Sequence, residues 1–163
     1  MRRVVADTGP VHYLVLIGQI SLLPALFERI LIPVSVRDEM LHRNTPDVVR
    51  RWIENPPTWL EVMADPVREL HDPELAELDD GERAALLLAE SIRAALVLMD
   101  DRAGVIAAKR KGFTVTGTLG VLTLAAERRL VDLEAAIAQL SSTNFRYAQR
   151  LIDRLLEAHR GRT

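Results

Sequence analysis

The chain has 163 residues, of which 48% are hydrophobic and 27% are charged, a composition typical of a globular domain. Its formal net charge of −2 excludes a basic field over the whole protein, so nucleic acid would have to bind a local patch. The lack of cysteine excludes disulfides, thiolate zinc sites and cysteine nucleophiles, and the lack of long apolar runs argues against a membrane span. We therefore expect one domain over residues 1–163, located in the cytoplasm.

Short β-branched runs alternate along the chain with segments of helical periodicity. Strands are predicted at residues 3–6, 30–32, 59–62, 95–99 and 113–115. Helices are predicted at residues 10–17, 21–27, 33–42, 46–54, 79–92, 102–111, 119–130, 133–140 and 147–159. The polar segment 65–78 is predicted to be an exposed loop or short helix. Because helices separate the strands, we expect an α/β fold, a three-layer α/β/α sandwich with a mainly parallel sheet, and the helices from about residue 133 packed on it.

Oxygen-bearing side chains follow three of the predicted strands. Asp7 follows the first strand, Asp100 and Asp101 follow the most apolar strand, and Thr116 and Thr118 follow the last. The carboxyl ends of parallel strands meet at one edge of a sheet, where ligand sites of open α/β folds form. Mg²⁺ and Mn²⁺ prefer carboxylate and water ligands. The sequence therefore predicts a divalent metal site at this edge, with Asp7, Asp100 and Asp101 as metal ligands.

The strand-end aspartates also have structural explanations. Asp7 can simply begin the turn into the next helix, as Asp often does after a strand. Asp100 can act as the N-cap of the helix expected to begin near Arg102. Two adjacent aspartates, Asp100 and Asp101, exceed what one cap requires, so a functional role is favoured for this pair.

Two glutamates on predicted helices, Glu39 and Glu82, have simple structural explanations as well. Asp79 and Glu82 have the D-x-x-E spacing of a capping box, which would account for both residues. Glu39 lies four residues before Arg43, so an exposed ion pair along the helix would account for it. Taken singly, each glutamate favours a structural role over a catalytic one.

Five segments spread over nearly the whole chain form a recognisable series. They are residues 5–10 (VADTGP), 32–40 (IPVSVRDEM), 78–85 (LDDGERAA), 98–102 (LMDDR) and 115–122 (VTGTLGVL). In this order they resemble the PIN-domain superfamily, and within it the VapC-like toxin branch. The last segment is similar to a glycine-bearing turn of one poorly characterised branch, which the tail around residues 144–146 also resembles.

This resemblance implies a flavodoxin-like α/β/α fold and an endoribonuclease that cleaves single-stranded RNA with Mg²⁺ or Mn²⁺. It implies that the catalytic residues are Asp7, Glu39, Glu82 and Asp100. It also implies a toxin of a toxin–antitoxin pair, a homodimer inhibited by a small antitoxin protein. No membrane partner is expected.

One departure from the family pattern concerns the last strand. Many PIN nucleases carry a further carboxylate there, whereas this chain offers Thr116 and Thr118. A hydroxyl can hold a metal-bound water but adds no negative charge, so these threonines, together with Thr8, are expected only to support the site. The alternative function is a PIN-like module that has lost catalysis and binds a partner protein.

Basic residues near the second acidic motif are candidates for phosphate contacts. Arg102 directly follows Asp101, and Lys109, Arg110 and Lys111 end the same predicted helix. Arginine suits phosphate because its planar fork can donate two hydrogen bonds to it. We expect phosphate contacts from Arg102, Lys109 and Arg110, although an ordinary solvated helix face explains the last three cations equally well.

Overall fold

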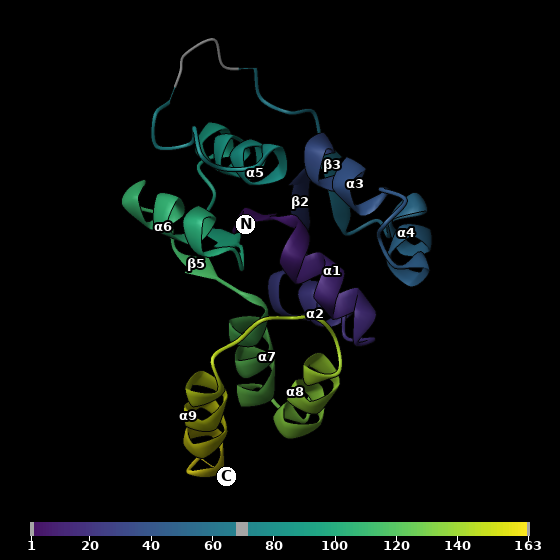
Figure 1. Ribbon diagram of the computed structural model, residues 1–163, viewed down its shortest axis with the longest axis vertical. Helices are drawn as coiled ribbons and strands as arrows, with labels where there is room; N and C mark the ends of the chain where they lie inside the picture. Colours follow the sequence, from purple (N-terminus) through teal and green to yellow (C-terminus); the bar gives the residue numbers. More distant parts are fainter. Residues whose placement is uncertain (1, 68–71, 163) are drawn as a thin grey trace.

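A computed structural model describes residues 2–67 and 72–162 of the chain (Figure 1). Within these residues, one sheet contains the strands β1 (Val4–Ala6), β2 (Ile30–Pro33), β3 (Leu60–Met63), β4 (Leu96–Leu98) and β5 (Val115–Thr116). The strand order is β3-β2-β1-β4-β5, and each neighbouring pair is parallel. The predicted parallel α/β sheet is confirmed.

The helices that follow these strands agree closely with the expected ones. They are α1 (Thr8–Leu16), α2 (Leu22–Phe27), α3 (Val34–Met40), α4 (Asp47–Glu54), α5 (Asp80–Ile92), α6 (Arg102–Arg110), α7 (Thr118–Glu127), α8 (Leu133–Ser141) and α9 (Gln149–Arg160). The prediction was wrong at Pro33, which ends β2 opposite Met63 instead of opening a helix. Helix α1 begins two residues before the expected Pro10, because a proline in the first turn lacks only an N–H that needs no helical partner.

The predicted loop at residues 65–78 is described only in part. Residues 65–67 contain neither helix nor strand, and residues 73–77 form turns. The expectations for residues 68–71 lie outside the described part of the chain. Leu75 and Leu78 are buried, so this end of the segment is packed against the protein rather than exposed.

Two hydrophobic cores lie on opposite faces of the sheet. Val4 and Ala6 of β1 belong to the first core, and Val5 belongs to the second. In β4, Leu98 belongs to the first core and Val97 to the second. Successive side chains of a strand point to opposite faces, so a strand covered on both sides is apolar throughout. Helices α1–α4 and α7–α9 contribute to the first core, and α5 and α6 to the second (Figure 1). The predicted three-layer α/β/α sandwich is confirmed.

The direction of the chain changes between β1 and β4. From β1 the chain proceeds outward to β2 and β3, and it returns through α5 to β4 on the other side of β1. The amide of Asp7 donates to the carbonyl of Leu98 at 2.8 Å, which ties the carboxyl ends of the two central strands together. Crevices beyond this kind of reversal are where open α/β sheets bind ligands.

The C-terminal helices α8 and α9 pack against α7 and against each other. The connection between them crosses towards α1 (Figure 1). There, the Tyr13 hydroxyl donates to Asn144 Oδ1 at 2.9 Å, and the Tyr13 and Phe145 rings meet edge to face with centroids 4.9 Å apart. The connection therefore reaches the carboxyl ends of the central strands. In the described part of the chain, no helix is both long and apolar enough to cross a membrane.

Candidate active site

A cavity of about 590 Å³ opens at the carboxyl ends of β1 and β4. The five carboxylates expected there all line it: Asp7, Glu39, Glu82, Asp100 and Asp101. Thr8 and Arg102, also expected at the site, line the cavity as well. The strands supply the aspartates directly, while α3 and α5 bring the two glutamates from elsewhere in the chain.

Asp7 is the most buried carboxylate in the cavity. It precedes α1 in an extended conformation, but its side chain does not cap the helix, so turn formation alone does not explain it. Its side chain is 6% exposed, and Oδ1 has no hydrogen-bond partner among the described residues. Burial raises the pKa of Asp7 to about 8, with a further rise from Glu82 and other nearby carboxylates and an opposing effect of the Thr8 amide. A buried polar atom without a partner is costly, and Asp7 therefore needs a proton or a cation.

Asp100 is held by the start of α7. Thr118 donates its amide to Oδ1 at 2.7 Å and its hydroxyl to Oδ2 at 2.6 Å. The structural explanation of Asp100 as the N-cap of α6 is wrong, because Asp101 is the cap and accepts from the Ala103 amide at 3.0 Å. Burial raises the pKa of Asp100, and the two bonds from Thr118 counteract that rise.

Two glycines leave room for the Asp100 carboxylate. A Cβ at Gly9 would lie 2.9 Å from Oδ2, and a Cβ at Gly117 would lie 2.6 Å from Oδ1. Real Cβ atoms do not approach an oxygen so closely, so a side chain at either position would displace the carboxylate. The glycines of the first and last resembling segments therefore have a direct steric role at the site.

Glu39 turns into the protein rather than along its own helix. The Thr8 hydroxyl donates to Oε2 at 2.6 Å, and the Gly81 amide donates to Oε1 at 3.0 Å. These contacts bind α3 to the starts of α1 and α5, which an exposed ion pair with Arg43 would not do. Burial raises the pKa of Glu39, and the Thr8 bond acts in the opposite direction.

Glu82 both belongs to the capping box of α5 and lines the cavity. The predicted capping box is present: the Glu82 amide donates to Asp79 Oδ1 at 2.8 Å, and the Asp79 amide donates to Glu82 Oε2 at 3.2 Å. Glu82 is nevertheless 7% exposed and lines the cavity. Burial, with the charges of Asp79 and Asp101, raises the pKa of Glu82 to about 7. Capping therefore does not remove this carboxylate from the site.

Several expected residues do not reach the cavity. Thr116 is not among its lining residues, and its methyl group lies against Gly120. Lys109 and Arg110 lie in the last turn of α6, away from the cavity. Lys111 forms ion pairs with Asp72 and Glu90, each at 2.6 Å, and its side chain is only 12% exposed. It therefore belongs to a structural cluster rather than to a patch that faces a ligand.

A comparison with known families bears directly on this arrangement. A family model described as a PIN domain matches residues 3–160. The chain belongs to the PIN-domain family. PIN domains are generally nucleases, and they generally use divalent metal ions. Among curated proteins, the comparison finds no match to this PIN domain.

The cavity residues of this PIN domain fit a hard divalent ion such as Mg²⁺. Within the described residues, no three His, Asp or Glu side chains are grouped as a ready-made metal centre. Mg²⁺ rarely needs such a group, because it keeps several waters and takes one or two carboxylates together with substrate phosphate. Asp7 lines the cavity, and its Oδ1 is buried without a partner among the described residues, which is the condition that a cation would relieve. The donor set is all oxygen, as hard cations require.

The connection between α8 and α9, together with α1, adds residues to the cavity that their positions in the sequence did not predict there. Asn144, Phe145 and Arg146 line the cavity, and Tyr13 joins them from α1. The one signal for the first three was the resemblance of the tail to a PIN branch. For Tyr13 the sequence held no signal beyond its helical spacing.

Proposed function

We propose that this PIN domain is a metal-dependent endoribonuclease that hydrolyses single-stranded RNA. The observation that carries the proposal is an oxygen of Asp7 that is buried without a hydrogen-bond partner among the described residues, in a cavity that five further carboxylates line. Such a group is stable as a protonated acid or beside a cation, and the family generally uses divalent ions. We assign Mg²⁺ or Mn²⁺ as the cofactor.

In this proposal, Asp7, Asp100 and Asp101 would hold the ion, and Glu39 would bind it directly or through a water. When bound, the ion orients a water, lowers its pKa and offsets negative charge on the phosphodiester. Glu82 has a pKa of about 7, which suits a general base at neutral pH. It takes the proton of the attacking water as the new P–O bond forms and the bond to the leaving ribose oxygen breaks.

Arg102 and Arg146 supply the positive charge that the substrate phosphate needs. Both line the cavity, one at the start of α6 and the other in the connection between α8 and α9. Without these two arginines, the charged side chains around the cavity would all be negative. Lys109 and Arg110 would contact the RNA only beyond the cleaved bond, because they lie at the far end of α6.

The direct test uses the purified protein and a fluorescently labelled single-stranded RNA. We expect cleavage in Mn²⁺, no cleavage in EDTA, and much slower cleavage of double-stranded RNA or of DNA with the same sequence. Equal activity in EDTA would contradict the metal requirement. Equal rates on RNA and DNA would contradict the assignment of RNA.

A second candidate function is a PIN module that binds a partner without catalysis. Its support is that both Asp100 oxygens are already engaged by Thr118 and that the last strand carries no carboxylate. Calorimetric titration with Mn²⁺ separates the candidates. Heat of binding below millimolar metal supports the nuclease, and absence of binding at millimolar Mn²⁺ supports the module.

The biological role that we propose is that of a cytoplasmic, homodimeric toxin neutralised by a small antitoxin protein. This proposal is supported by the resemblance of the five acidic and glycine-bearing segments to the VapC-like branch. Induced expression in a bacterial host is the test: wild type should arrest growth and Asp7→Asn should not. A short, helix-rich or DNA-binding protein encoded next to the gene would support the same role.

A further inference from the structure

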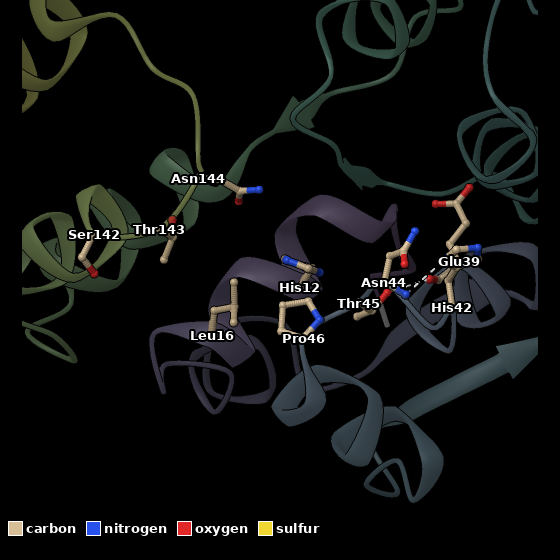
Figure 2. Close-up of a pocket in the computed structure, with 10 residues that line it drawn as sticks. All are labelled: His12, Leu16, Glu39, His42, Asn44, Thr45, Pro46, Ser142, Thr143 and Asn144. Atoms are coloured by element: carbon tan, nitrogen blue, oxygen red, sulfur yellow. Dashed lines mark hydrogen bonds between the residues drawn. The ribbon is translucent and has the colours of Figure 1, made fainter.

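A second cavity, of about 700 Å³, adjoins the acidic one. Glu39 and Asn144 line both cavities, so the two lie next to each other. Figure 2 shows His12 of α1 between Asn44 on one side and Asn144 on the other. We call this cavity the polar groove. Its volume falls within the roughly 300–1,000 Å³ that small-ligand sites occupy.

One face of α1 contributes residues to both cavities. Thr8, His12 and Leu16 are spaced four residues apart and therefore lie on the same face of the helix. Thr8 bonds to Glu39 in the acidic cavity, whereas His12 and Leu16 line the polar groove. A ligand that lies along this face of α1 would pass from the carboxylates into the groove.

The groove differs from the acidic cavity in its chemistry. Among the described residues that line it, none is Lys or Arg, and Glu39 at its border is the one carboxylate. Asn44 and Asn144 instead offer neutral donors and acceptors, whereas the hydroxyls of Thr45 and Thr143 already donate to the carbonyls of Glu39 and Leu140. This lining has little to attract a phosphate, and it suits an uncharged, hydrogen-bonding group.

Several of these polar groups have a fixed orientation. Asn144 accepts from Tyr13 through Oδ1 at 2.9 Å, so its NH₂ group remains to donate. His42 accepts from the backbone amide of Asn44 through Nδ1 at 3.2 Å, which leaves its Nε2–H to donate. Burial lowers the pKa of His12, so its ring is neutral at pH 7 and presents one donor and one acceptor.

We propose that the polar groove is a base-binding subsite, which holds the nucleobase of the nucleotide next to the cleaved phosphodiester. The sugar–phosphate backbone lies across the acidic cavity, and the base enters the groove between Asn44 and Asn144. Asparagine amides suit the edge of a base because each can donate and accept at once. A base can enter only when it is unstacked, which explains a preference for single-stranded RNA. The choice of an RNA base as the occupant rests on the proposed ribonuclease function.

The first test does not depend on cleavage. We would titrate the full chain, in EDTA, with AMP, GMP, CMP, UMP and ribose 5-phosphate, and follow the side-chain signals of His12, Asn44 and Asn144 by NMR. At least one nucleotide should shift these signals, and ribose 5-phosphate should leave them unchanged. Equal shifts with all five compounds, or no shifts in the groove with any of them, would overturn the proposal.

The second test compares two asparagines that flank the same helix. Asn44→Ala removes an exposed groove residue before α4, and Asn55→Ala removes an exposed asparagine after it. On a randomised RNA pool, Asn44→Ala should lower kcat/KM for the preferred sequences by about tenfold and weaken the preference at one position. Asn55→Ala should match wild type.

The two proposals fail in different ways. If wild type cleaves RNA but Asn44→Ala keeps the same rate and sequence preference, the base subsite is wrong and the nuclease stands. If wild type cleaves nothing in Mn²⁺ but one nucleotide still shifts the groove signals selectively, the nuclease is wrong, while the groove still binds a nucleobase.

Discussion

Thr118 donates two hydrogen bonds to Asp100, from its amide to Oδ1 at 2.7 Å and from its hydroxyl to Oδ2 at 2.6 Å. Thr118 is fully buried, so neither bond is shared with bulk water. The last strand thus contributes to the site without a carboxylate of its own, because its following threonine fixes the carboxylate of the neighbouring strand. The orientation of Asp100 is set before any ligand binds.

Thr118→Val should destabilise the protein by about 1–3 kcal/mol, because it leaves a buried carboxylate oxygen without its donor while the side chain keeps its shape. The pKa of Asp100 should rise further, since the bonds from Thr118 now lower it. Urea unfolding measures the first effect, and a carbon NMR titration of Asp100 measures the second. Thr116→Val is the matched control and should lie within about 0.5 kcal/mol of wild type. Equal stability of both variants would contradict the assigned bonds.

The stability of the metal-free protein should depend on the protonation of Asp7. Its pKa is about 8 in the folded protein and near 3.8 in an unfolded chain, so the folded state holds more protons between these values. The resulting stabilisation is complete below pH 3.8 and is lost as the pH rises through 8, by up to about 1.4 kcal/mol per pH unit. The pKa of Glu82, about 7, adds a loss in the same direction.

Asp7→Asn isolates this effect. Urea unfolding in EDTA should show that the variant gains stability relative to wild type as the pH rises from 5 to 9, because asparagine has no proton to lose. The gain would cease in saturating Mn²⁺, where the cation replaces the proton on wild-type Asp7. A difference between wild type and Asp7→Asn that is constant over this pH range would refute the raised pKa.

Gly81→Ala tests the packing around Glu39. A Cβ at Gly81 would clash with Glu39 Oε1, although alanine favours the helix by about 1 kcal/mol over glycine. Overpacking costs typically 1–3 kcal/mol, so we expect a net loss of stability and a large loss of RNA cleavage as Glu39 moves. Gly161→Ala is the control, since the nearest atom to its Cβ would be 3.6 Å away. Full activity of Gly81→Ala would argue against a role for Glu39.

The fold could be predicted because its signals are local. A strand covered on both faces is apolar throughout, as residues 96–99 are, and helices have their own periodicity. The positions of Asp7 and Asp100 followed from the same logic, since both come directly after a parallel strand. Helix starts shifted by a residue or two, because the local sequence tolerates several first turns.

The remainder of the site depends on tertiary contacts that carry no local signal. Glu39 reaches Thr8 and Gly81 across 31 and 42 residues of sequence, so its role depends on how α3 packs against α1 and α5. The same holds for Arg146, which the packing of α8 and α9 brings to the cavity. Sequence position alone therefore favoured the structural explanation for Glu39.

Lys111→Met tests whether the last cation of α6 is structural. Its ammonium forms ion pairs with Asp72 and Glu90 and is little exposed. Losing one partner of an exposed pair costs up to about 1 kcal/mol, and of a buried pair roughly 3–5 kcal/mol. We expect Lys111→Met to lower the free energy of unfolding by an amount between these values. Lys109→Met, on the same helix but exposed, should change the free energy of unfolding by less than about 0.5 kcal/mol. Equal stabilities for the two variants would show that the cluster contributes nothing.

The most direct measurement is RNA cleavage by Asp7→Asn in Mn²⁺, beside wild type and the exposed-site control Asp153→Asn. Asparagine keeps the shape of Asp7 and removes the charge that would hold the ion. Wild type and Asp153→Asn should cleave single-stranded RNA at equal rates, whereas Asp7→Asn should lose at least about a hundredfold in kcat/KM. Undiminished cleavage by Asp7→Asn would contradict the central claim that this buried carboxylate is a required metal ligand of a ribonuclease site.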